Sequence, residues 1–237
     1  MGDGRRVKVV RTALITGANR GIGLHTARAL ARQGLRVIVA ARARADLDAA
    51  VAQLASERLV VMPLLLDVAR IESIRAAATV LAQQDVAVDV LVNNAGVYFE
   101  GSVLSASDAD FVQALEVNTL GSLRCARAFL PGMIERGYGR IVNLSSGYGC
   151  FANGLDGPAA YSLSKAALNA ATVILARACR GDVKIAAVDP GWVRTRMGGP
   201  QAPRTVEEAA ADVAWAATLD ASAPNGVLWR RRERAAW

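Results

Sequence analysis

Residues 12–23 read Thr12-Ala13-Leu14-Ile15-Thr16-Gly17-Ala18-Asn19-Arg20-Gly21-Ile22-Gly23, an apolar run that leads into three glycines. Residues 22–33 then carry apolar side chains at helical spacing, and Gly34 supplies a stop signal. Glycine tolerates a tight turn and lets the backbone approach a phosphate, while a helix N-terminus offers unpaired N–H groups. The order strand, glycine loop, helix therefore predicts a nucleotide site. The alternative is a tight turn without a ligand.

The rest of the chain alternates short apolar runs with alanine-rich stretches of helical period. This alternation is typical of βαβ units around a parallel sheet covered by helices on both faces. We therefore expect one α/β domain over residues 1–237, with a doubly wound parallel sheet. The expected strands span residues 7–16, 36–40, 59–66, 88–93, 140–145, 183–189 and 227–229.

Two kinds of local signal support this division. Asp46 stands near the start of an expected helix over residues 47–57, and Ser107 or Asp108 precedes another that runs toward Val117. The Gly- and Pro-rich residues 190–203 form a long expected loop, and loops of this length often cover a ligand. A helix is expected to follow from about Val206.

Composition excludes several classes of protein. The chain has 237 residues, of which 53% are hydrophobic and 21% charged, so it is not compositionally disordered. No apolar run approaches the roughly 20 residues that span a bilayer, and the polar start does not resemble a secretion signal, so we expect a cytoplasmic protein. A single histidine, His25, and three scattered cysteines argue against a histidine-based triad, a zinc site and a disulfide framework.

The formal net charge is +7, which can indicate an anionic partner. Its basic residues are spread out, however, except for Arg230, Arg231, Arg232 and Arg234 near the end of the sequence. A short run of this kind is more typical of a solvated tail or a subunit contact than of a nucleic-acid surface. We therefore expect no nucleic-acid partner, and salt-dependent retention on DNA would contradict that expectation.

The residues after the second expected strand indicate the cofactor. A site specific for NAD usually carries an acidic residue there, about 20 positions beyond the loop, which binds the ribose hydroxyls. This chain has Arg42 instead, and Arg20 lies within the glycine loop. Two guanidinium groups suit a 2′-phosphate, so we predict NADPH rather than NADH. The alternative is that either arginine is an ordinary surface residue. Asp67 either accepts a hydrogen bond from adenine or caps a helix.

Tyr161 and Lys165 are four positions apart in an alanine-rich helical stretch, so their side chains project from one face. A phenol with a pKa near 10 exchanges protons poorly at neutral pH. A neighbouring ammonium would lower that pKa, and the pair would then serve as a general acid.

Further polar groups follow the ends of the expected strands, where the ligand crevice of an open parallel sheet lies. They comprise Asn93-Asn94-Ala95-Gly96, Asn118, Ser145-Ser146 and Asp189-Pro190-Gly191-Trp192-Val193-Arg194-Thr195. From about residue 11 to residue 195, this ordered set resembles the short-chain dehydrogenase/reductase family. The whole set is far more specific than any one of its members.

The resemblance implies a Rossmann-type sheet of seven parallel strands and a role for each matching residue. Tyr161 would be the proton donor and Ser146 would hydrogen-bond the substrate carbonyl. Lys165 would bind the nicotinamide ribose and tune Tyr161, and Asn118 would hold a water in a proton relay. The cofactor would be held by Gly17, Asn19, Arg20, Gly21, Ile22, Gly23, Arg42, Asp67, Val68, Asn94, Ala95, Gly96, Tyr161, Lys165, Pro190, Gly191, Val193 and Thr195.

Two features depart from the family pattern. The interval from Ser146 to Tyr161 is slightly longer than usual, which leaves Ser145 as the other choice for the substrate-binding serine. The segment after Thr195 is short, which leaves the pocket more open. Apolar pocket walls, or simple core packing, are the alternatives for Tyr98, Phe99, Tyr148, Phe151, Leu155, Trp192 and Met197.

Together with the resemblance, the catalytic and cofactor-binding residues named above predict an NADPH-dependent oxidoreductase. It would reduce a ketone or aldehyde to an alcohol. The sequence around Trp192 and residues 226–230 is most similar to carbonyl-reductase-like members. The alternatives are reduction of a 3-oxoacyl thioester and a non-catalytic regulator that binds NADPH. By the same resemblance we expect a homodimer or homotetramer, with helices near residues 121–136 and 161–179 between subunits.

Overall fold

The computed structural model describes residues 10–237, which form an α/β domain around one eight-stranded sheet. The strand order is β3-β2-β1-β4-β5-β6-β7-β8. The strands are β1 (Thr12–Ile15), β2 (Arg36–Ala41), β3 (Val61–Leu65), β4 (Val90–Asn93), β5 (Tyr138–Leu144), β6 (Asp182–Asp189), β7 (Val227–Arg230) and β8 (Glu233–Ala235). Strands β1 to β7 pair in parallel, which confirms the doubly wound sheet. Residues 7–9 of the expected first strand lie outside the described residues.

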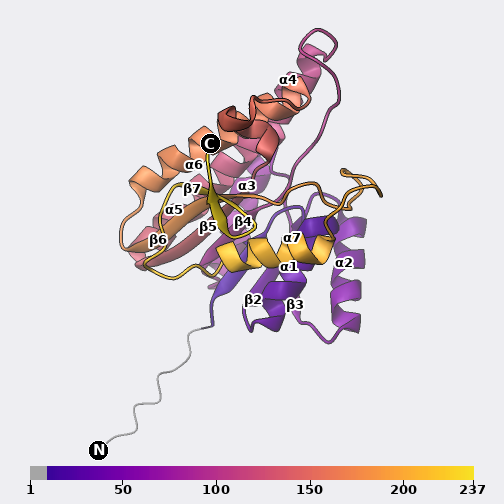
Figure 1. Cartoon of the computed structure of the whole chain (residues 1–237). Helices are drawn as coiled ribbons and strands as arrows, with labels where there is room; N and C mark the ends of the chain where they lie inside the picture. The colour runs from indigo at the N-terminus through magenta and orange to yellow at the C-terminus, as the bar shows by residue number, and fades with distance from the viewer. Residues whose placement is uncertain (1–9) are drawn as a thin grey trace, which may run out of the picture.

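Helices cover both faces of this sheet (Figure 1). They are α1 (Gly21–Arg32), α2 (Arg44–Ser56), α3 (Ile71–Gln83), α4 (Asp108–Ala114), α5 (Ser122–Glu135), α6 (Ala159–Ala178) and α7 (Val206–Ala216). Side chains of α1, α2 and α7 share one buried cluster, and side chains of α3, α5 and α6 share another. The period of two along a strand explains this split, because Ala13 and Ile15 of β1 enter the first cluster and Leu14 enters the second.

The two edge strands of the sheet differ from its centre. Edge strand β3 contains Pro63, which has no backbone N–H to donate. At the other edge β7 turns back into the antiparallel strand β8, which the sequence did not predict. Arg231 and Arg232 form the turn with φ values of 51° and 66°, in the left-handed region that glycine or asparagine usually occupies. Because the turn lacks glycine and asparagine, the sequence carried no signal for this hairpin.

Helix starts agree with the local capping signals in part. Ser107 caps α4, and its hydroxyl and the Asp110 carboxylate form a capping box. Helix α2 begins at Arg44, three positions before the expected start, so Asp46 lies within its first turn. Between α4 and α5 the backbone forms a π-helix, η1 (Leu115–Gly121), which no sequence signal predicted.

Helix α6 is long and apolar enough to cross a membrane, with a mean hydropathy of 1.2, although 56% of that stretch is buried inside the protein. It packs against β6, η1 and the turn at Gly147–Gly149, and Leu175 belongs to the core. A buried core helix of this length meets the same criterion as a membrane span. The packing therefore explains its apolar composition.

Candidate active site

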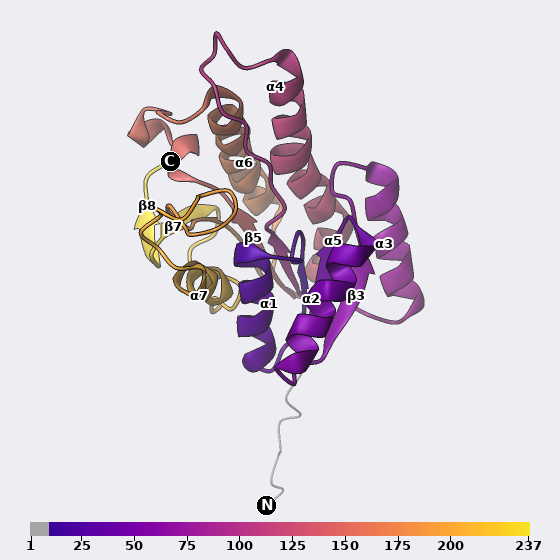
Figure 2. The same cartoon turned by 90° about the vertical axis from the view of Figure 1, so that its right-hand side faces the viewer.

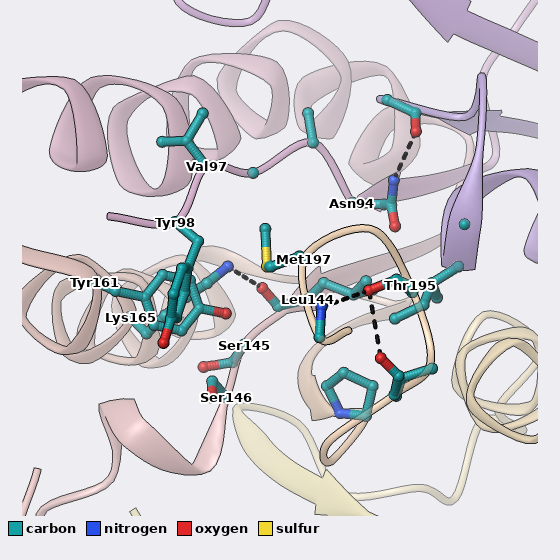
Figure 3. Close-up of a pocket in the computed structure, with 18 of the residues that line it drawn as sticks. Asn94, Val97, Tyr98, Leu144, Ser145, Ser146, Tyr161, Lys165, Thr195 and Met197 are labelled. Carbon is teal, nitrogen blue, oxygen red and sulfur yellow. Dashed lines mark hydrogen bonds between the residues drawn. The ribbon is translucent and has the colours of Figure 1, made fainter. Parts of the chain in front are cut away.

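A cleft of about 1780 Å³ lies at the carboxyl ends of the parallel strands, where the sequence placed the polar clusters. Figure 3 shows side chains from β5, α6 and the loop after β6 meeting in it. The residues predicted to form the site line this cleft, with two exceptions, Gly23 and Asn118. Both exceptions lie behind the surface of the cleft and hold its walls.

The glycine loop forms one end of the cleft. Gly17 and Gly21 have φ values of 61° and 53°, which glycine adopts without strain. A Cβ on Gly23 would lie 2.4 Å from Asn94 Nδ2, so only glycine permits this close approach of α1. The Asn94 amide in turn donates to the carbonyl oxygens of Thr16 and Gly17, at 2.8 and 3.0 Å. Gly23 and Asn94 therefore set the shape of the loop.

The start of α1 suits an anionic ligand. Among residues 10–237 no side chain caps this helix, and its first turn contains no acidic residue. The backbone N–H groups of that turn therefore face the cleft with the positive end of the helix dipole. Arg20 and Arg42 are exposed at the same end of the cleft. The arrangement fits a dinucleotide with a pyrophosphate and an additional phosphate.

Asp67 lines the cleft and also stabilises its own turn. One oxygen of its carboxylate, Oδ1, accepts a hydrogen bond from the Ala69 backbone N–H at 3.0 Å. Helix α3 begins after Arg70, so Asp67 is not its capping residue. Its other carboxylate oxygen, Oδ2, accepts no hydrogen bond from the described residues. The helix-cap interpretation is therefore wrong, and the adenine contact stays a prediction.

Tyr161 and Lys165 project from one face of α6 into the cleft, as their spacing predicted (Figure 3). The Lys165 Nζ lies 5.5 Å from the centre of the Tyr161 ring and donates to the Leu144 carbonyl oxygen at 2.6 Å. Burial lowers the pKa of Lys165 to about 8. A buried amine beside a buried phenol is an arrangement suited to proton transfer.

The expected lowering of the Tyr161 pKa is not what the structure shows. Burial raises the pKa of the Tyr161 phenol, and its hydrogen bond with Ser146 only partly opposes that effect. The sequence argument considered the neighbouring ammonium but not desolvation, which disfavours the phenolate. Lys165 also directs its ammonium to Leu144, so at this distance it does not offset the burial.

Ser145 and Ser146 have different surroundings at the end of β5. The buried Ser145 hydroxyl donates to the Asn169 side-chain oxygen. Ser146 faces Tyr161, and its Oγ accepts from the Tyr148 backbone N–H at 3.2 Å. Because the Ser145 proton already has a partner, Ser146 is the serine available to a ligand at the phenol.

Asn118 lies within the π-helix η1 and is completely buried. Its Oδ1 accepts from the Val97 N–H at 2.8 Å, and its Nδ2 donates to the Val97 carbonyl and to Ser164 Oγ. The side chain therefore joins the wall of the cleft to α6. Within helices, π segments are frequent at functional sites because they redirect one side chain.

The expected loop over residues 190–203 lines the cleft through residues 190–198, and α7 follows from Val206, as predicted. Val193 pairs with Arg204, and the Arg194 N–H donates to the Arg204 carbonyl oxygen at 2.9 Å. Thr195 Oγ1 accepts from the Gly198 N–H at 3.0 Å. The segment is thus a closed loop with internal hydrogen bonds.

The apolar candidates divide into two groups. Tyr98, Phe99, Tyr148, Trp192 and Met197 line the cleft, and the Tyr98 ring packs edge-on against Tyr161 with centres 5.0 Å apart. Phe151 and Leu155 do not line it, because the segment after β5 turns them away from the strand ends. The interpretation that they form an apolar wall of the pocket was therefore wrong for Phe151 and Leu155.

Two charged residues at the substrate end of the cleft were not predicted as a pair. Asp189 is buried at the end of β6, and Arg230 at the end of β7 donates to its Oδ2 at 2.6 Å. Both line the cleft. The parallel register of β6 and β7 aligns them, and only strand pairing could have revealed this contact.

Comparisons with known proteins agree with this geometry. A family model described as short chain dehydrogenase matches residues 11–205. Galactitol 2-dehydrogenase (L-tagatose-forming) of Cereibacter sphaeroides is 38% identical over 186 residues, which are 78% of this chain and 72% of that protein. A relative from Streptomyces coelicolor, whose name proposes ketoacyl reductase activity, is 37% identical over 188 residues, 78% of this chain and 71% of that protein.

A solved structure is similar over nearly the whole chain. The NADPH-bound carbonyl reductase from chicken fatty liver superposes with a TM-score of 0.86 and 29% sequence identity. The alignment covers 96% of this chain and 99% of that one.

Proposed function

The chain belongs to the short-chain dehydrogenase/reductase family, and from this premise we propose that it is an NADPH-dependent oxidoreductase that reduces a ketone or aldehyde to an alcohol. The single observation that carries this proposal is the cluster of Tyr161, Lys165 and Ser146 in a cleft whose other end suits a dinucleotide. The similarity to an NADPH-bound carbonyl reductase supports the choice of cofactor.

The residues present fit NADPH in three places. The first turn of α1 would bind the pyrophosphate, and Arg20 and Arg42 would bind the 2′-phosphate. Pro190, Gly191, Val193 and Thr195 would contact the nicotinamide end, while Lys165 would bind its ribose. Bound there, NADPH supplies the hydride that reduces the carbonyl carbon.

In the proposed mechanism the side chains control the substrate oxygen. Ser146 Oγ donates a hydrogen bond to the carbonyl, and a well-placed donor of this kind stabilises the developing negative charge by about 2–4 kcal/mol. Tyr161 donates its phenolic proton to that oxygen, which completes the alcohol. The raised pKa of Tyr161 keeps the phenol protonated and ready to donate. Lys165 stabilises the phenolate that results when its ammonium turns from Leu144 toward the ring.

Replacement of the phenol tests the proposal. Tyr161→Phe removes only the hydroxyl, so turnover should fall by at least about 100-fold, the usual contribution of a general acid, while NADPH binding changes little. Turnover is measured with a carbonyl library by following NADPH consumption, with NADH for comparison. Tyr138→Phe is the matched control, because Tyr138 lies at the start of β5 and does not line the cleft. Wild-type rates in Tyr161→Phe would reject the assignment.

A second candidate reaction is the reduction of a 3-oxoacyl thioester. The Streptomyces coelicolor relative favours it, and the exposed arginines of the chain would suit an acidic carrier. The same library should therefore include an acetoacetyl thioester of pantetheine. A kcat/KM for that compound well above the values for simple ketones would select this alternative. Binding of NADPH without turnover of any carbonyl compound would instead indicate a regulator.

We further propose that two or four copies assemble through α5 and α6, as in many members of the family. Helix α6 supports this proposal, because Leu163 and Ile174 are 48% and 65% exposed on one face with Ala170 between them. The cytoplasmic location and the lack of a nucleic-acid partner stay predictions from composition.

A further inference from the structure

The arginines near the end of the sequence have specific partners in the fold. Among the described residues, two of the four, Arg230 and Arg232, form ion pairs with carboxylates, and Arg231 and Arg234 form none. Arg230 ends β7 and Arg232 lies in the turn of the β7–β8 hairpin. Each contacts a carboxylate that is itself bound to the loop beside the cleft. The run is therefore more than a solvated tail.

The first connection runs through Asp189. Arg230 Nε donates to Asp189 Oδ2 at 2.6 Å, and Asp189 Oδ1 accepts from the Gly191 N–H at 2.9 Å. The Asp189 side chain is 5% exposed, so its charge depends on this arginine for compensation. The pair thus fixes the backbone of Gly191 relative to β7.

The second connection runs through Asp212 of α7. Arg232 Nε donates to Asp212 Oδ1 at 3.1 Å, and Arg204 Nη2 donates to Asp212 Oδ2 at 2.8 Å. Arg204 Nη1 in turn donates to the Pro190 carbonyl oxygen at 2.6 Å. The Asp212 carboxylate therefore holds Arg232 and Arg204 in one orientation. The contacts lead from Arg232 through Asp212 and Arg204 to Pro190, which precedes Gly191.

The end of the sequence also contacts the segment that follows β5. The Ala152 N–H donates to the Trp237 carbonyl oxygen at 2.9 Å, and Trp237 and Ala235 pack against the buried Cys150. Figure 2 shows this end of the chain beside the segment that follows β5. Residues 227–237 therefore contact Asp189 at the end of β6 and also the segment after β5.

We propose that Arg230 and Arg232 are positioning residues for the nicotinamide end of the cofactor site: through Asp189 and through Asp212 with Arg204, they fix Pro190 and Gly191. The inference rests on the proposed binding of NADPH. It assigns a function to the arginine run that neither the family motifs nor the shape of the cleft explains.

The test compares two ligands that share one end. Adenosine 2′,5′-bisphosphate occupies only the part of the site near Arg20 and Arg42, whereas NADPH also reaches Pro190 and Gly191. Arg232→Gln should weaken NADPH about three- to tenfold, the size of a modest coupling through a network, and leave the bisphosphate unchanged. Binding is measured by calorimetry. Arg232→Lys retains the charge and should recover most of the affinity for NADPH.

Three control variants separate positioning from a general effect. Arg231→Gln and Arg234→Gln remove unpaired neighbours from the same hairpin and should change neither affinity. Arg42→Ala should weaken both ligands together. Equal weakening of both ligands by Arg232→Gln, or unchanged binding of NADPH, would overturn the inference. Arg230→Gln is a less suitable variant, because it leaves the buried Asp189 carboxylate without compensation and threatens folding.

A second measurement does not depend on the cofactor. Amide hydrogen exchange over residues 190–204 should become faster in Arg232→Gln than in Arg231→Gln, because the loop loses one of its anchors. Faster exchange in a protein that fails to bind NADPH would reject the proposed function and retain the positioning role. Equal exchange in the two variants would reject the positioning role itself.

Discussion

Lys165 illustrates how burial determines the properties of one residue. It is buried in α6 beside the cleft, and among the described residues its ammonium donates to one carbonyl oxygen, that of Leu144. Below pH 8 the folded protein keeps a charged amine in this position. Its burial then lowers stability relative to a neutral side chain of similar shape.

The resulting pH dependence has a definite sign. The folded-state pKa of Lys165 is about 8 and its ordinary value is 10.5, so between these limits the unfolded chain binds the proton that the folded chain releases. Stability therefore rises with pH in this window. Lys165→Met should increase the free energy of unfolding at pH 7 by about 3 kcal/mol, and the gain should disappear near pH 10.5. Urea denaturation at several pH values measures it, with Lys184→Met as control.

Sequence reasoning identified residues better than it identified their environments. The spacing of Tyr161 and Lys165 placed both on one face of a helix, and the structure agrees. It could not show that burial raises the Tyr161 pKa, because desolvation depends on elements distant in the sequence, such as the segment that carries Tyr98. The role of each residue in catalysis stays a prediction.

At the scale of elements, the π-helix η1 connects two sides of the cleft. It redirects Asn118 so that this side chain satisfies both backbone polar groups of Val97 and also reaches Ser164 on α6. An ordinary α-helical continuation from α4 into α5 would turn the side chain elsewhere. Loss of these contacts would leave buried polar groups of the cleft wall without partners.

Asn118→Ala should therefore reduce both stability and turnover. The free energy of unfolding should fall by roughly 1–3 kcal/mol, because the Val97 N–H and carbonyl lose their partners in a partly buried site. Ser164→Ala removes only one of the three Asn118 contacts and should cost less. Urea denaturation checks the order of the two variants. Equal stability of Asn118→Ala and the wild type would show that the contacts contribute nothing.

The elements that sequence reasoning found and missed differ in their local signals. Strands β1 to β7 carry apolar runs bounded by turns, so all seven were predicted, with boundaries within a few residues. Strand β8 is charged and follows a turn without glycine or asparagine, so it resembled a tail. For η1 the pattern of residues is the same as for an α-helix, and the difference arises from packing.

At the scale of the whole molecule, one helix presents an apolar face that the described residues leave uncovered. Exposed Leu163, Ala170 and Ile174 form such a face on α6. An uncovered apolar stripe on a helix is a common site of association between subunits.

Ile174→Glu should therefore convert an assembled protein into a smaller species, because it places a charge in the centre of an apolar interface. Light scattering after size-exclusion chromatography measures the mass. Val80→Glu on α3 is a suitable control, since Val80 is also exposed, at 40%, but lies on a different helix. An unchanged mass for Ile174→Glu would exclude α6 as the interface.

The hairpin turn at Arg231 and Arg232 opposes selection for stability to selection for coenzyme binding. Two left-handed non-glycine residues cost of the order of 1 kcal/mol or more each, which Asn-Gly at these positions would recover. A screen for heat resistance would thus favour replacement of Arg232, which would remove its ion pair with Asp212. We expect variants selected for thermal stability to bind the coenzyme with lower affinity. Selection for growth would therefore oppose this exchange.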